Sequence, residues 1–307
     1  MWQLFSGIYL GGALGANDSA NIFGTAVTTK VVKFETAIAL TSLFVLMGAA
    51  LEGVGGIHTL GRLADQTLMS AFVSSLAAAI TVSLMTYFGL PISTSQAVVG
   101  AIIGTGFLSG QVNFAPLGPI VLAWITTPIG AAVIAALIYW VYLNFIEEKI
   151  SGIVQLDNFI KVALIITGAY GAYSLGANNV ANITGVYVQA GLFGPQLGGL
   201  IGGMSIGLGV IYSRKVMETV GSKITRLTPL TALIAVLAHS ITLYIYARIG
   251  IPVSSSQAIV GGVVGIGLVK DINMIDVKTT KSIIFGWLGT PTVAAVVGLV
   301  LGLFLLP

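Results

Sequence analysis

The sequence predicts an all-α polytopic membrane protein made of two inverted-topology repeats, and three observations lead to this fold class. Hydrophobic residues make up 56% of the 307 residues and charged residues only 7%, whereas soluble domains carry about 25% charged residues. Long apolar segments follow one another along the whole chain, and short polar motifs recur at a nearly constant offset. A chain of this composition needs a lipid bilayer as its surroundings.

Ten apolar segments are long enough, or nearly so, to enter a bilayer as helices, and helix is required because lipid cannot satisfy open backbone groups. We expect two of them to be interrupted, at residues 17–21 and 178–182, where polar residues stand within apolar runs. The segments lie at about 2–29, 34–51, 69–88, 91–109, 116–143, 157–190, 195–213, 229–248, 252–269 and 282–306.

The two halves of the chain repeat each other. The matched landmarks are G-A-N-D at 15–18 with G-A-N-N at 176–179, G-L-P-I-S-T-S-Q-A-V-V-G at 89–100 with G-I-P-V-S-S-S-Q-A-I-V-G at 250–261, and W-I-T-T-P at 124–128 with W-L-G-T-P at 287–291. Five segments in each half, an odd number, would invert the second half, which is the plan of many secondary transporters. We therefore divide the chain into residues 1–150 and 151–307, each one half of a transport domain.

The distribution of Lys and Arg favours one orientation in the bilayer. With Lys30 and Lys33 in the cytoplasm, eleven of the thirteen Lys and Arg residues lie inside, and only Arg62 and Arg248 lie outside, as the positive-inside rule expects. Both termini are then predicted outside, in a multi-pass protein of a cell (inner) membrane. Because these cations flank apolar runs, the sequence pI of about 9.1 does not indicate a nucleic-acid partner.

Asp18 is the acidic residue that we expect deep within a span. A charge there costs about 2.5–3.5 kcal/mol, so it needs a cation, hydrogen bonds or a proton. Carboxylate, amide and unwound backbone oxygens at a helix break suit Na⁺, although a neutral Asp18 in a contact between helices is an alternative. The predicted Na⁺ site consists of Asn17, Asp18, Asn21, Asn178, Asn179 and Asn182.

The two copies of Pro-x-Ser-[Thr/Ser]-Ser-Gln predict an anion site. Pro is favoured at the start of a helix and Ser or Thr caps the free N–H groups, so each copy is expected to begin a helix inside the membrane. Such a helix end carries partial positive charge and unpaired donors; the alternative is a capped helix at the membrane surface. The predicted anion ligands are Ser93, Thr94, Ser95, Gln96, Ser254, Ser255, Ser256 and Gln257.

These residues predict a transporter rather than an enzyme. We expect no Lys or Arg within a span, so Na⁺ would have to offset the repulsion between Asp18 and an oxyanion, a physical reason for cotransport. No ATP-binding phosphate loop is found, since G-T-A-V-T-T-K at 24–30 lacks the second Gly. Paired acids and nucleophile–base sets are not visible, and no cofactor is expected besides Na⁺ as the coupling ion. A passive anion channel is the alternative class. His239 is interpreted as a polar packing residue, with a proton relay as the alternative.

The motifs resemble the inorganic phosphate transporter (PiT) family, of the sodium/phosphate symporter type. The resemblance rests on G-A-N-D-S-A-N at 15–21, G-A-N-N-V-A-N at 176–182 and the two Ser-Gln motifs, and it covers essentially the whole chain. It implies a secondary active transporter that imports inorganic phosphate with Na⁺ or H⁺ by alternating access. Many relatives have Asp in place of Asn179, and some have His in place of Gln96 and Gln257. A proton-coupled phosphate or sulfate permease therefore stays open as the alternative. The many glycines would also permit a homodimer.

Overall fold

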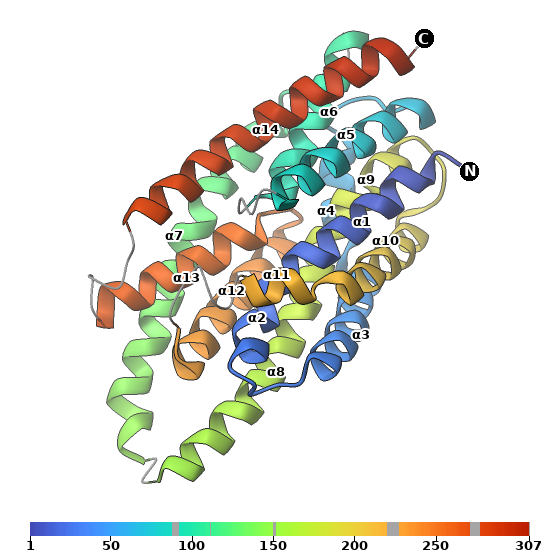
Figure 1. The fold of residues 1–307 in the computed structure, drawn as a ribbon. Coiled ribbons are helices and arrows are strands. Elements are labelled where there is room, and N and C mark those ends of the chain that lie inside the picture. Colours follow the sequence, from blue (N-terminus) through green and yellow to red (C-terminus); the bar gives the residue numbers. More distant parts are fainter. Residues whose placement is uncertain (88–91, 111, 150–151, 220–226, 271–276, 307) are drawn as a thin grey trace.

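The computed structural model describes the chain except residues 88–91, 111, 150–151, 220–226, 271–276 and 307, and it is a bundle of helices (Figure 1). The first half contains α1 (Leu4–Asp18), α2 (Ala20–Thr28), α3 (Phe34–Glu52), α4 (Val54–Gly61), α5 (Leu68–Tyr87), α6 (Thr94–Ser109), α7 (Leu117–Val141), η1 (Tyr142–Ile146) and η2 (Glu147–Lys149). The second half contains α8 (Ile153–Asn179), α9 (Ala181–Gln189), α10 (Pro195–Gly209), η3 (Val210–Tyr212), α11 (Arg214–Thr219), α12 (Pro229–Ile249), α13 (Ser255–Lys270) and α14 (Val277–Leu305). No strand occurs in the described residues, and the all-α fold class is confirmed.

Each of the ten predicted segments corresponds to helix in the structure. Within the described residues, six helical stretches are long and apolar enough to cross a membrane by themselves. By contrast, α6 and α13 have 16 residues each. At 1.5 Å per residue such a helix is about 24 Å long, less than the roughly 30 Å of a hydrocarbon core. Each therefore has room to begin within the bilayer, preceded by the non-helical chain of its Ser-Gln motif.

The two predicted interruptions are present, but the backbone there is not unwound as we expected. Ser19 separates α1 from α2 and Val180 separates α8 from α9. Both residues keep right-handed helical dihedrals, with φ −61° and ψ −26° at Ser19 and φ −59° and ψ −29° at Val180. The Ser19 N–H still reaches the Gly15 carbonyl at 3.4 Å. Because the backbone stays nearly helical and keeps such bonds, these breaks offer side-chain oxygens rather than a run of free carbonyls.

The two halves pack against each other in a reciprocal way. The helix α6 lies along α14 and α13 lies along α7, while α3 packs on α8 and α1 on α10. Glycines allow the closest approaches: a Cβ on Gly15 would overlap the Ile206 carbonyl, and a Cβ on Gly176 would overlap the Val45 carbonyl. Both residues of the second contact are the first pair shifted by 161 positions, with the halves exchanged. Equivalent positions therefore make equivalent contacts, as in two repeats related by an approximate two-fold axis.

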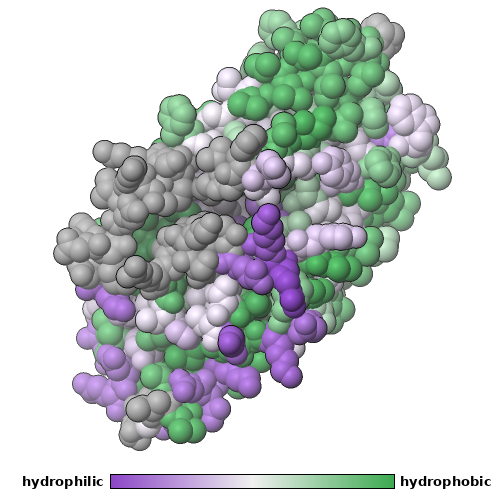
Figure 2. All heavy atoms as spheres, in the orientation of Figure 1, coloured by the Kyte–Doolittle hydropathy of each residue, from purple (hydrophilic) through white to green (hydrophobic). Residues whose placement is uncertain are grey.

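The surface separates apolar from charged regions. Figure 2 shows hydrophobic side chains over α14 and α6, and hydrophilic ones over α11 and the ends of α7 and α8. Arg214 of α11 pairs with Glu35 at 3.5 Å. Both chain ends lie away from the turn between α7 and α8 (Figure 1), which is consistent with termini on one side and Lys149 on the other. Lys223 and Arg226, part of the predicted inside charge, lie outside the described residues. The inverted orientation and the side of the termini stay predictions.

Candidate functional site

The two Ser-Gln motifs begin helices, as the sequence predicts. Ser93 is the N-cap of α6, and its hydroxyl accepts a hydrogen bond from the Gln96 N–H at 3.2 Å. Ser254 does the same for Gln257 before α13, also at 3.2 Å. The cap leaves further first-turn N–H groups without a partner inside the helix. All eight predicted anion ligands are buried, none more than 5% exposed. Pro91, the Pro of the first copy, lies outside the described residues.

One serine of each motif holds the two motifs together. The Ser95 hydroxyl donates to the Val253 carbonyl at 2.9 Å, and the Ser256 hydroxyl donates to the Ile92 carbonyl at 2.5 Å. These bonds are the same bond with the halves exchanged, since Ser95 matches Ser256 and Ile92 matches Val253. The starts of α6 and α13 therefore lie side by side. Because Ser95 and Ser256 use their hydrogens on backbone carbonyls, they clamp the site rather than face it with a free donor.

The second asparagine copy, which consists of Asn178, Asn179 and Asn182, supports this pair of helix starts. Asn178 accepts from the Val253 N–H at 2.9 Å and donates to the carbonyls of Ile251 at 3.1 Å and Leu243 at 3.3 Å. This amide thus fixes the extended chain before α13. One turn later, the Asn182 amide donates to Ser95 Oγ and to Asn179 Oδ1, both at 3.0 Å. Asn178 and Asn182 therefore both contact residues of the Ser-Gln motifs.

The first asparagine copy, which consists of Asn17, Asp18 and Asn21, makes fewer side-chain hydrogen bonds, and its two asparagines are less buried. Asn17 and Asn21 are half-buried, and Asn17 donates to the Asp18 carboxylate at 3.0 Å. Asn21 reaches the other half, where its amide donates to Ser255 Oγ at 3.1 Å. Asp18 is 2% exposed, and no Lys or Arg pairs with it among the described residues. Since a buried carboxylate needs compensation, Asp18 is suited to a bound cation.

Several buried polar atoms around the motifs have no hydrogen-bond partner in the described part of the chain. They are Thr94 Oγ1, Gln96 Oε1, Gln257 Oε1, Asn179 Nδ2, Asn182 Oδ1 and His239 Nδ1. Buried polar groups are normally paired, and each exception needs a reason. Their gathering at the two helix starts is the pattern expected of a site that binds a polar ligand.

His239 lies at this site, although the sequence predicted a polar packing residue, with a proton relay as the alternative, and not a contact with the Ser-Gln motifs. It lies in α12, is fully buried, and its Nε2 is 2.8 Å from Ser255 Oγ. His239 lies 16 residues before Ser255, on the helix that leads into the motif. It belongs to no sequence motif that would have predicted this contact. Only the packing of α12 against α13 brings the imidazole to the hydroxyl.

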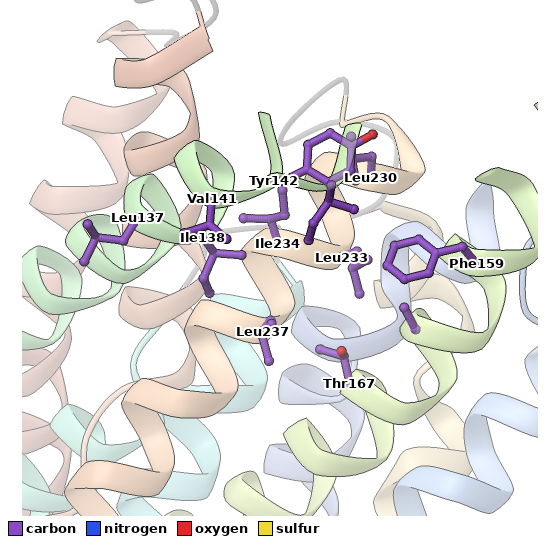
Figure 3. A pocket seen from close by; sticks show the side chains of 12 residues that line it. Leu137, Ile138, Val141, Tyr142, Phe159, Thr167, Leu230, Leu233, Ile234 and Leu237 are labelled. Carbon is purple, nitrogen blue, oxygen red and sulfur yellow. The ribbon is translucent and has the colours of Figure 1, made fainter. Parts of the chain in front are cut away.

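A separate groove of about 330 Å³ lies between α7, α8 and α12, away from the motifs. Figure 3 shows side chains such as Leu137, Phe159, Leu233 and Leu237 converging on it. Its lining is almost entirely apolar, with Thr167 and Tyr142 as the polar exceptions. An oxyanion has no cluster of donors there, so the motif site and not this groove is the candidate for a charged substrate.

Comparison with known proteins shows which family the chain belongs to. The model of the phosphate transporter family matches residues 14–155 and 147–298. The chain belongs to this family. A candidate phosphate permease of Methanocaldococcus jannaschii is 34% identical over 97% of this chain and 95% of its own length. The sulfate permease CysP of Bacillus subtilis is 29% identical over 91% of this chain and 80% of its own.

The fold of this family member also matches a solved structure. A sodium-dependent phosphate transporter superposes with a TM-score of 0.86 over 99% of both chains, at 22% identity. At that identity the likeness concerns the fold alone. Membership of the phosphate transporter family, together with the apolar helices of membrane-spanning length, makes the chain a multi-pass membrane transporter and not an enzyme, as predicted.

Proposed function

We propose that this transporter carries inorganic phosphate across the membrane together with Na⁺, by alternating access around the paired starts of α6 and α13. The observation that carries the proposal is the reciprocal clamp of Ser95 on Val253 and Ser256 on Ile92. It aims two helix N-termini at one region. Each contributes partial positive charge and free N–H donors, which together suit a tetrahedral oxyanion.

The hydroxyl groups between the cap and the clamp are the best candidates to bind phosphate oxygens. Thr94 and Ser255 occupy equivalent positions in the two copies, and neither hydroxyl donates to a backbone carbonyl in the described structure. Gln96 and Gln257 follow one turn into each helix and are buried. Ser93 and Ser254 act as caps, and Ser95 and Ser256 as clamps, so these four would shape the site around the anion.

Na⁺ would bind next to this site through the asparagine copies. In the first copy, Asp18 would supply the negative charge, and the half-buried Asn17 and Asn21 would supply amide oxygens. In the buried second copy, Asn182 Oδ1 has no hydrogen-bond partner in the described residues. Asn178 and Asn179 complete the proposed set of Na⁺ ligands. Because no basic side chain of the motifs neutralises the anion, cation and phosphate would bind more tightly together than apart, and the coupling is reciprocal.

Uptake of labelled phosphate into proteoliposomes tests the proposal. We expect accumulation with an inward Na⁺ gradient to exceed that with choline in place of Na⁺ by about tenfold or more, within the usual range of coupling between sites. A proton gradient without Na⁺ should not substitute. Flux that is equal in Na⁺ and choline and never exceeds the outside concentration would instead identify a passive channel.

A proton-coupled phosphate or sulfate permease is the second candidate, and the similarity to CysP favours testing it. A site that offers donors only would accept sulfate as well as phosphate, because both anions have four acceptor oxygens. Adding excess sulfate to the phosphate uptake assay separates the two substrates. Strong inhibition, followed by transport of labelled sulfate itself, would move the assignment to the second candidate.

A further inference from the structure

The Ser255 hydroxyl is held by two side chains from different parts of the chain. Asn21 donates to it from α2 at 3.1 Å, and His239 of α12 places Nε2 at 2.8 Å. His239 is fully buried. The equivalent position in the first half, 161 residues earlier, is Ala78, which is also fully buried. The imidazole is therefore a feature of one half only.

The hydrogens around Ser255 can be assigned from its neighbours. A hydroxyl has one hydrogen to donate and two lone pairs to accept. Asn21 fills one lone pair, because an amide nitrogen can only donate. A neutral imidazole carries its proton on one nitrogen, so Nε2 of His239 either donates to the hydroxyl or accepts from it.

The other ring nitrogen decides between these tautomers. His239 Nδ1 is buried and has no partner in the described residues. Among backbone groups, orphaned buried N–H donors are rarer than orphaned acceptors; by the same reasoning we place the proton on Nε2, which then donates to Ser255. With both lone pairs of the hydroxyl filled, by Asn21 and His239, its hydrogen must point elsewhere.

We propose that His239 is a positioning residue, which fills the second acceptor site of Ser255 and so commits the Ser255 hydroxyl hydrogen to the bound oxyanion. This inference rests on the proposed function, in which Ser255 contacts phosphate. It also separates the two copies. Thr94 Oγ1, the counterpart of Ser255, has no partner in the described residues and is free to rotate, whereas Ser255 is oriented before the substrate arrives.

The histidine content of the chain allows a direct spectroscopic test on the wild-type protein. Only two histidines are present, so His58→Gln assigns the signals. In the phosphate-bound protein, nitrogen NMR of labelled histidine should show His239 as the neutral tautomer protonated on Nε2. Protonation on Nδ1 would overturn the proposal, because Ser255 would then donate to the ring instead of to the anion.

Transport measurements with matched variants test the consequence. His239→Phe keeps an aromatic ring but removes the donor, and it should raise the phosphate KM about tenfold, the scale of one hydrogen bond to a charged group. His239→Gln, whose amide can donate to the same hydroxyl, should restore most of the affinity. Thermal unfolding of each variant in detergent reports whether the fold is kept.

A double-mutant cycle distinguishes positioning from general packing. If His239 acts through Ser255, then His239→Phe should add no further rise in KM to Ser255→Ala. Additive effects, or wild-type affinity in a folded His239→Phe protein, would overturn the inference and leave the proposed function intact. If Ser255→Ala itself leaves the phosphate KM unchanged, the proposed substrate site fails, whatever tautomer His239 adopts.

Discussion

The two asparagine copies have nearly the same sequence but very different surroundings. In the second copy, Asn178, Asn179 and Asn182 are at most 1% exposed, and all three bond to neighbours. In the first copy, Asn17 and Asn21 are half-buried, and the bonds are fewer. The difference teaches that two nearly identical sequence elements can differ in burial and hydrogen bonding, and it implies that the first copy contributes more of the proposed Na⁺ ligands than the second.

The two copies also differ in charge, because only the first contains an acidic residue, Asp18. Asp18 has Asn179 as its counterpart, and the Asn179 oxygen accepts from the Asn182 amide at 3.0 Å and lies 3.4 Å from Ser95 Oγ, whose hydrogen is directed mainly to the Val253 carbonyl. An acid at 179 would sit in a closed network, whereas the acid at 18 lies beside the open copy. The one acid of the two copies thus lies in the copy that has fewer hydrogen bonds.

Asp18→Asn, which makes the first copy read like the second, should have the largest effect. Without the carboxylate the proposed Na⁺ site loses its charge and the coupling to phosphate, worth about 5–150-fold in affinity. Na⁺-dependent uptake should fall by at least tenfold, while thermal stability should not decrease, because a neutral amide is cheaper to bury. Initial uptake rates at varied Na⁺ measure the effect, and a wild-type response to Na⁺ would contradict the assigned role.

Moving the acid tests whether the copies are interchangeable. The variant with Asp18→Asn and Asn179→Asp keeps the number of carboxylates and transfers one to the closed copy. We expect it to remain inactive, because Asn179 already serves Asn182 and Ser95. Recovered Na⁺ dependence would show that the two copies are functionally equivalent despite their different burial.

Asn178→Ala against Asn17→Ala compares equivalent positions by stability. The Asn178 change leaves three backbone groups without their partner, those of Val253 and Leu243 buried and that of Ile251 partly buried. An unpaired buried group costs about 1–3 kcal/mol, so the free energy of unfolding should fall by about 3 kcal/mol. Asn17→Ala should leave thermal unfolding in detergent nearly unchanged and raise the Na⁺ concentration needed for half-maximal uptake. If both variants unfold at the same temperature, Asn178 does not support the fold more than Asn17 does.

Ser95→Ala against Ser256→Ala should give the smallest effects, and similar ones, because this pair is the symmetric part of the site. Each change removes one hydroxyl-to-carbonyl bond between the halves, worth about 0.5–1.5 kcal/mol. Each hydroxyl also accepts one further bond, Ser95 from Asn182 at 3.0 Å and Ser256 from Ser254 at 2.9 Å, so the two losses should be close in size. Chemical unfolding curves of the two variants provide the comparison, and a large loss confined to Ser256→Ala would show that the clamp is not reciprocal.

The structure contains a helix that hydropathy did not predict. The helix α4, with three glycines in eight residues, is too short and too irregular to stand out in the sequence, yet it packs on α9. Likewise the expected unwound carbonyls at Ser19 and Val180 are replaced by nearly continuous helix. Local composition marked both breaks correctly but did not determine their backbone, because neighbouring helices and short-range hydrogen bonds hold them.

The sequence by itself determined the membrane class, the segments, the duplication and the capped starts of α6 and α13. All of these depend on composition, period and local hydrogen bonding, which are properties of a segment and its near neighbours. Only the tertiary structure decided that Ser95 and Ser256 clamp, that Asn178 supports the backbone before α13 and that His239 faces Ser255. These roles depend on contacts between residues far apart in the chain, and two copies of one motif acquire different roles when different helices pack around them.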